Sequence, residues 1–170
     1  MSVEALAAWV LSVMLSAVPP GKTRHTKDAR ETAEAGRARY AQIAREIAEV
    51  ALDPAEEPLF DGPYAREKTA AVMLAISYHE SHWRRDVDYG VGPNARGGGG
   101  RYHCLMQVEA KGGKTPEGYT PEDLVKNRLK CFRAGLHILQ RGNRMCRGRG
   151  MINHYATGSC TNARQAVAKR

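Results

Sequence analysis

The 170-residue sequence lacks several features that would place it in a common class. No apolar run reaches the ~20 residues that a membrane-spanning helix requires. Its four cysteines contain no CxxC pair, so neither a zinc ribbon nor a redox motif fits their spacing. No heptad or longer repeat is present, which excludes a coiled coil or a solenoid. Stable membrane insertion is therefore not expected.

The apolar segment from Val3 to Val18 lacks the positive charge that opens an export signal. It is preceded by no Lys or Arg and carries Glu4 near its start. We interpret it as a buried N-terminal helix, with a membrane-tethering helix as the alternative. No clear signal peptide is therefore identified.

Composition indicates an ordinary globular protein with a basic surface. Apolar residues make up 42% and charged residues 26% of the chain, whose net charge is +8. Such a charge attracts nucleic acid, anionic lipid or anionic cell-wall polymers, although it also simply keeps a protein in solution. Charge alone does not choose among these partners.

Hydrophobic periodicity and helix-ending residues predict a mainly α protein. Gly-rich composition between residues 86 and 113 interrupts the helices, and the apolar piece 104–108 predicts one strand. The fold class is therefore a helical bundle with a small loop and strand lobe. Helices are expected at about residues 3–17, 28–52, 64–82, 121–140 and 152–155, with a further stretch at 162–168 and an Arg- and Gly-rich loop at 141–150.

Glu80 is the leading candidate for chemistry. It ends the apolar helical run that begins at Leu74. Burial disfavours the charged form of a carboxyl group, so a Glu in this position is expected to have a raised pKa and to serve as a general acid near neutral pH. A solvated Glu at a helix end is the alternative.

Four short motifs occur in order around this residue: Glu80-Ser81, then Leu105-Met106-Gln107, a helix with Asn127, Gly135 and Leu139, and Tyr155-Ala156-Thr157-Gly158. Over about Val72 to Cys160 this set resembles the lytic transglycosylases of the lysozyme-like superfamily. The resemblance implies a lysozyme-like catalytic domain at 61–170, with residues 1–60 as a helical preface packed on it.

The resemblance also implies roles for individual residues. Glu80 would be the catalytic acid and base with Ser81 beside it, and Met106 and Gln107 would line the cleft beside the sugar. Tyr155 would contact the Glu or the substrate. Two positions depart from the family pattern: Cys104 replaces a Gly, and Thr157 stands at a substrate position where Asn is usual.

Three functions remain open at this stage. A lytic transglycosylase would cut peptidoglycan with Glu80 alone, because the muramoyl 6-hydroxyl attacks and an anhydro sugar forms. A hydrolytic muramidase would need a second carboxylate, for which Asp86 and Asp88 are the candidates. The third possibility is a non-catalytic basic module that binds cell wall or DNA.

No cofactor or metal is expected. His79 and His82 are three residues apart, whereas a helical zinc motif requires a spacing of four. The expected partner is the glycan strand of peptidoglycan, with anionic cell-wall polymers as a further possibility and a monomer as the expected state. Specific nucleic-acid binding is not expected, because few aromatic residues accompany the basic patch at Arg141, Arg144, Arg147 and Arg149.

Four cysteines allow three pairings, or they remain free buried thiols. We predict Cys104–Cys131, because the strand-like segment should pack on the helix carrying Cys131. We predict Cys146–Cys160, because these residues bracket the segment with Tyr155. Disulfides would indicate a protein that acts outside the cytoplasm, either secreted, periplasmic or associated with a phage virion or phage lysis.

Overall fold

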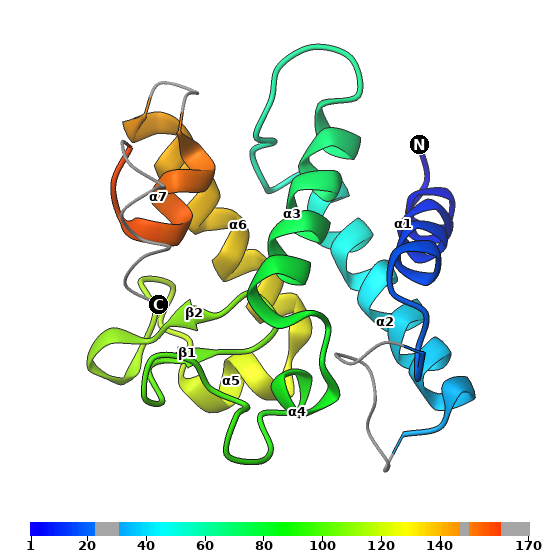
Figure 1. The fold of residues 1–170 in the computed structure, drawn as a ribbon. Coiled ribbons are helices and arrows are strands. Elements are labelled where there is room, and N and C mark those ends of the chain that lie inside the picture. The colour runs from blue at the N-terminus through cyan, green and yellow to red at the C-terminus, as the bar shows by residue number, and fades with distance from the viewer. Residues whose placement is uncertain (23–30, 147–149, 161–170) are drawn as a thin grey trace.

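A computed structural model describes residues 1–22, 31–146 and 150–160, and it confirms a mainly helical fold with a small strand lobe (Figure 1). The predicted stretch 162–168 lies outside the described residues. The elements in chain order are α1 (Val3–Ala17), α2 (Ala33–Leu52), α3 (Ala65–Ser81), α4 (Arg85–Asp88), β1 (Tyr102–His103), β2 (Val108–Glu109), the 3₁₀ turn η1 (Lys111–Gly113), α5 (Pro121–Lys126), α6 (Arg128–Met145) and α7 (Met151–Thr157).

The first two helices begin where a hydroxyl side chain caps the backbone. Ser2 Oγ accepts from the amide of Ala5 at 3.2 Å, and Thr32 Oγ1 accepts from the amide of Ala35 at 3.1 Å. The predicted start of the second helix at Asp28 lies outside the described residues, but residues 31 and 32 are not helical. The cap at Thr32 therefore sets the beginning of α2.

The helix predicted at 121–140 is two helices. Asn127 has extended backbone angles (φ −135°, ψ 99°), and its side chain accepts from the amide of Lys130 to cap α6. Helix α6 then continues to Met145, so the prediction of a loop from residue 141 was wrong over 141–145. Residues 147–149 of that predicted loop lie outside the described part of the chain.

The single strand predicted at 104–108 was also wrong. Two short antiparallel strands, β1 and β2, flank residues 104–107, so only Val108 of the predicted strand lies in one of them, and Tyr102 is opposite Glu109. Residues 104–107 form the turn between them, in which Cys104 and Gln107 adopt positive φ angles of 60° and 48°. These angles are costly for residues with a Cβ. The Gln107 amide side chain stabilises them by donating to the carbonyl of Cys104 at 3.0 Å.

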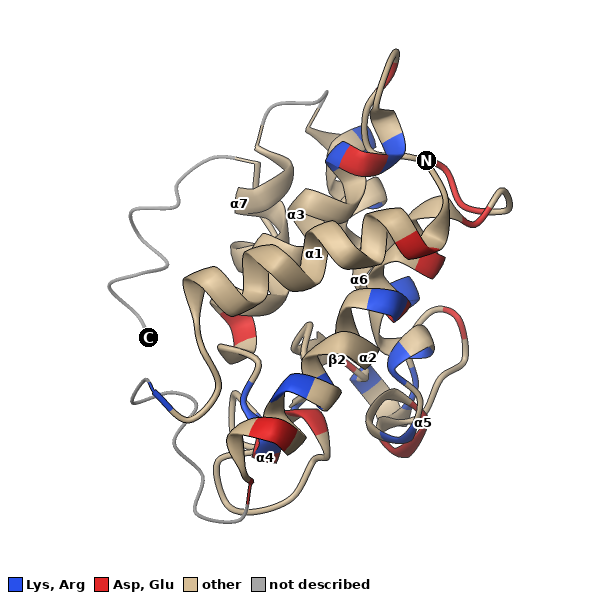
Figure 2. Ribbon diagram, turned by 90° about the vertical axis from the view of Figure 1, so that its right-hand side faces the viewer, with Lys and Arg blue, Asp and Glu red and all other residues tan. Residues whose placement is uncertain are grey.

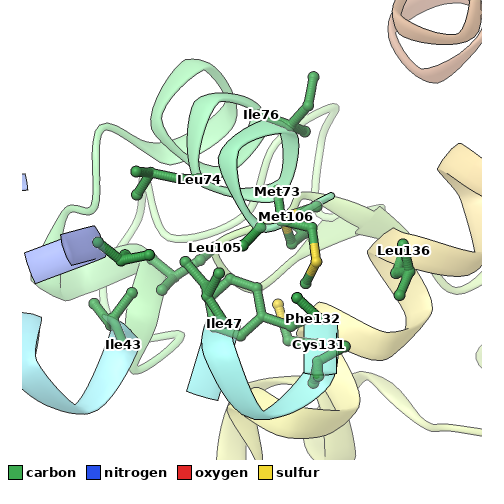
Figure 3. Close-up of a cluster of buried hydrophobic side chains, with 14 of the residues drawn as sticks. Ile43, Ile47, Met73, Leu74, Ile76, Leu105, Met106, Cys131, Phe132 and Leu136 are labelled. Carbon is green, nitrogen blue, oxygen red and sulfur yellow. The ribbon is translucent and has the colours of Figure 1, made fainter. Parts of the chain in front are cut away.

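Helices α2, α3 and α6 share one core, into which the turn between the strands inserts (Figure 3). Leu105 and Met106 are at most 1% exposed. Close approach of this turn requires Gly135, because a Cβ there would lie 2.5 Å from Met106 Cε. Core residues come from both sides of the expected boundary at residue 60, for example Ile47 from α2 and Phe132 from α6.

Helix α1 packs along α2 and carries no Lys or Arg (Figure 2). Its inner stripe of Leu6, Val10 and Met14 is buried, whereas Trp9 on the outside is half exposed. None of the described helices is long and apolar enough to cross a bilayer.

A buried ion-pair network fastens α4 to α2 and α6. The Asp88 side chain is 0% exposed and lies between two guanidinium groups. Arg128 donates two hydrogen bonds to it, at 2.6 and 2.9 Å, and Arg39 lies 3.4 Å away. Arg39 is in turn paired with Glu31 at 2.7 Å. Because charges are costly to bury, each depends on its partners remaining in place.

We expect Asp88→Asn to lower the free energy of unfolding by about 3–5 kcal/mol, because it leaves two buried arginines without their shared counter-ion. Asp86→Asn is the matched control, because Asp86 pairs with Arg84 near the surface and should cost less than about 1 kcal/mol. Urea denaturation of both variants measures the difference. Equal stability of the two variants would contradict the role given to Asp88.

Candidate active site

A cleft of about 1190 Å³ lies between the end of α3, the strand lobe, α6 and α7. Helical and lobe residues therefore face each other across it. Its lining includes Glu80 and His79 from α3, Gln107 and Glu109 from the lobe, Ala134, Ile138 and Arg141 from α6, and the segment His154–Gly158 from α7.

Glu80 reaches this cleft because the chain turns sharply just after it. His82 and Trp83 both have positive φ, 51° and 49°, which ends α3 at Ser81. The Trp83 indole is buried and donates to Ser77 Oγ at 2.9 Å. The helix end is thus fixed by the core, while Glu80 remains partly exposed on the cleft side.

Tyr155 of α7 joins the helical side of the cleft to the lobe. Its hydroxyl donates to the backbone carbonyl of Met106 at 2.5 Å. Burial raises the pKa of Tyr155 well above its ordinary value, and the negative charge of Glu80 raises it further. Glu80 and Tyr155 line the same cleft, and the raised pKa keeps the phenol a protonated donor over the ordinary pH range.

Gln107 and Thr157, two of the predicted substrate contacts, line the same cleft. Gln107 Oε1 accepts from the amide of Gly97 at 3.0 Å, which shapes the lobe wall. Thr157 donates to the carbonyl of Asn153 at 2.8 Å at the end of α7. With Glu80 and Tyr155, four of the predicted site residues meet in one cavity.

Ser81 and Met106 are not among the lining residues. Ser81 is 2% exposed, and its hydroxyl donates to the carbonyl of Ser77 at 2.6 Å. Met106 is fully buried against Gly135 and presents only its carbonyl to Tyr155. The side chains of both residues are therefore packed in the core behind the cleft wall.

The two aspartates predicted as a possible second carboxylate do not line the cleft either. Asp88 is held by Arg39 and Arg128, and Asp86 pairs with Arg84. Two other acids, Glu109 and Glu117, line the cleft instead. Glu109 lies two residues after Gln107, so its closeness in the sequence to a predicted cleft residue was the signal that could have placed it here.

The carboxylate of Glu117 is hydrogen-bonded to His137 of α6. His137 Nδ1 lies 3.0 Å from Glu117 Oε1, and His137 Nε2 lies 2.9 Å from Glu56 Oε2. Burial acts to raise the pKa of Glu117, but hydrogen bonds from Thr115, its own backbone and His137 outweigh burial and lower it. A carboxyl group with a lowered pKa is a poor general acid.

Both predicted disulfides are confirmed. Cys104 joins Cys131 with a Cα–Cα distance of 6.2 Å, and Cys146 joins Cys160 at 5.3 Å. One bond ties the lobe to the first turn of α6, and the other ties the end of α7 to the end of α6. Loops of this length stabilise a fold by roughly 3 kcal/mol or somewhat more. Two disulfides are typical of proteins that fold in an oxidising compartment outside the cytoplasm.

Within the described residues, no group of three or more His, Cys, Asp or Glu side chains is arranged to hold a metal ion. Comparisons with protein-family models, curated proteins and solved structures find no match for this chain. What the cleft can do chemically therefore follows from its own side chains. They supply one carboxyl group at a helix end, a partly buried phenol in the same cleft, and amide and hydroxyl groups along the walls.

We expect Tyr155→Phe to lower the free energy of unfolding by about 1–2 kcal/mol at pH 7, because the carbonyl of Met106 loses its donor. The pKa of Tyr155 is raised on folding, so its contribution is complete below the unfolded value of about 10 and is lost as the pH rises through the folded value. The gap between the two proteins should therefore shrink at pH 11. Urea denaturation at both pH values tests this, with the exposed Tyr64→Phe as control. Identical stability of Tyr155→Phe and the unaltered protein at pH 7 would contradict it.

Proposed function

We propose that this protein is a lysozyme-like glycosidase that cleaves the β-1,4 bond between N-acetylmuramic acid and N-acetylglucosamine in peptidoglycan. The observation that carries the proposal is the position of the Glu80 carboxyl group, which lies at the end of helix α3 and faces a large cleft. Its negative charge also raises the pKa of Tyr155 in the same cleft. The cleft volume of about 1190 Å³ exceeds that of an ordinary small-molecule pocket, which suits a polymer.

Glu80 would act first as an acid and then as a base. Its proton passes to the glycosidic oxygen, the bond to the muramoyl carbon breaks, and an oxocarbenium-like sugar forms. The muramoyl 6-hydroxyl then attacks that carbon and gives up its proton to Glu80. The products are a strand with an anhydromuramic end and a strand with a free 4-hydroxyl on its terminal sugar.

A lytic transglycosylase accounts for the acids of this cleft better than a hydrolase does. A hydrolase needs a second carboxylate near the scissile bond, but Asp86 and Asp88 lie in ion pairs away from the cleft. Glu117 is occupied by His137. The hydrolytic alternative therefore depends on Glu109, whose place in the cleft is the one observation that favours it.

A secreted, periplasmic or virion-borne location, acting on the cell wall as a monomer, fits this function and the two disulfides. A purely binding module is less well supported, because binding alone requires no carboxyl group at the end of a helix beside a partly buried phenol. Of the predicted basic patch, Arg144 pairs with Glu57 and Arg141 lines the cleft, while Arg147 and Arg149 lie outside the described residues.

We expect Glu80→Gln to reduce lytic activity by about 10²–10⁴-fold with no loss of stability, because the amide keeps the shape but donates no proton to the leaving oxygen. Loss of turbidity of purified cell walls measures the rate, and circular dichroism checks the fold. Glu34→Gln, on the exposed face of α2, is the control for removal of one negative charge. A well-folded Glu80→Gln protein that still lyses walls would refute the assignment.

We expect mass spectrometry of the soluble products to show anhydromuramic ends, and Glu109→Gln to change the rate by less than about threefold, because water activation is not required. Products heavier by one water, with reducing ends, would identify a hydrolase. If Glu109→Gln then also abolished activity, Glu109 would be the residue that positions the water.

A further inference from the structure

His103 on β1 is the most buried of the described histidines, with 4% of its surface exposed. Its Nδ1 atom is enclosed and has no hydrogen-bond partner among the described residues. The residue lies opposite Val108, itself 1% exposed, in a pair of strands of two residues each. A neutral ring with its proton on Nε2 fits this site, whereas a charged ring would place an N–H at Nδ1 with no acceptor.

Protonation of His103 is therefore unfavourable in the folded protein. Burial lowers the pKa of this histidine, and the positive charge of Arg96 lowers it further. Arg96 is exposed on the loop before β1, and the bridge between Gly97 and Tyr102 holds this part of the loop beside the strand. A charged His103 would thus meet both an apolar enclosure and a cation of the same sign.

The other charged groups around β1 do not offset this cost. On β1's own side, Arg101 donates to the carbonyl of Gly98. Strand β2 carries Glu109, which is exposed and lines the cleft. Helix α5 also contacts β1, and its charges are already joined in ion pairs: Glu122 with Lys126, and Asp123 with Lys130. No carboxylate of the described residues is hydrogen-bonded to the His103 ring at Nδ1.

Movement of β1 would bring a charged ring to water, and the lobe offers little resistance to it. Two residues pair with β2, which is a small number of hydrogen bonds for a strand. The next residue, Cys104, is bonded to Cys131, so the strand can shift while the disulfide keeps it attached to α6. Tyr102 and Gln107 on either side of this point line the cleft, so a shift of β1 alters the cleft wall.

We propose that His103 makes the strand lobe sensitive to pH: in acid its ring takes up a proton, β1 separates from the core, and the lobe wall of the cleft opens. An unfolded histidine has a pKa of about 6.5, and folding lowers the pKa of His103. The stability that the neutral ring provides is therefore complete above pH 6.5 and is lost as the pH falls from there toward the folded value. Only the consequence for glycan cleavage rests on the function proposed above.

The two disulfides allow an internal comparison, because one fastens the lobe and the other fastens the segment after α7. Mass spectrometry after treatment with a phosphine reductant measures the rate at which Cys104–Cys131 is reduced relative to Cys146–Cys160. We expect this ratio to rise at least about threefold from pH 7 to pH 5, because each unit by which folding lowers a pKa changes an opening equilibrium by up to about tenfold.

Two variants assign the response to His103. His103→Leu cannot take up a proton, so its ratio should stay the same at both pH values. Arg96→Glu leaves the core untouched and places a negative charge near the ring, so at low salt its rise should be smaller than that of the unaltered protein. Arg37→Glu, an equal charge reversal at an exposed position on α2, is the matched control and should keep the full rise.

An equal rise in His103→Leu and the unaltered protein, or no rise in the unaltered protein, would overturn the inference. If His103→Leu does not fold, Arg96→Glu decides, and a rise equal to that of Arg37→Glu would count against His103. Cell-wall lysis tests the consequence: the unaltered protein should lose a larger share of its rate between pH 7 and pH 5 than His103→Leu. Absence of lysis by both would refute the proposed function, while the disulfide ratio would still decide the behaviour of the lobe.

Discussion

Attachment of both cleft walls to α6 is the constraint on which the rest of the site depends. A disulfide joins the lobe to Cys131 near the start of the helix, and a second disulfide joins the segment after α7 to Cys146, where the helix ends. The two strands have two residues each and the last helix has seven, so neither wall has enough hydrogen bonds or core of its own to hold a fixed position. Covalent attachment to a long, buried helix supplies the missing rigidity.

The same helix also positions residues of the candidate site relative to one another. Gly135 on α6 lets Met106 approach, and the carbonyl of Met106 then receives the Tyr155 hydroxyl. This bond connects the two walls, and the negative charge of Glu80 raises the pKa of the same phenol. A small residue on α6, a buried thioether and a phenol thus form one continuous contact that ends beside the candidate catalytic acid.

Charges serve two separate purposes in this molecule. Charges of both signs gather around α4, where Asp88 is shared by two arginines and links three helices (Figure 2). The basic residues that line the cleft, Arg101, Lys111, Lys114 and Arg141, form no ion pair with a described residue. The positions of the basic residues therefore say more than the net charge of +8, because some cations organise the fold through ion pairs and others line the cleft.

The sequence by itself determined the helices, whose apolar periodicity and capping residues such as Thr32 are local properties, and it was enough to predict both cysteine pairs. It also singled out Glu80, through its place at the end of an apolar run together with the four ordered motifs around it. The break at Asn127 was missed although an Asn cap is a local signal. The turn at Cys104 and Gln107 was missed because it depends on distant contacts, among them the disulfide to Cys131. Only the tertiary structure decided which acids share the cleft, since Asp88 and Glu109 look alike in sequence, yet one is enclosed by arginines from distant helices and the other faces the cavity.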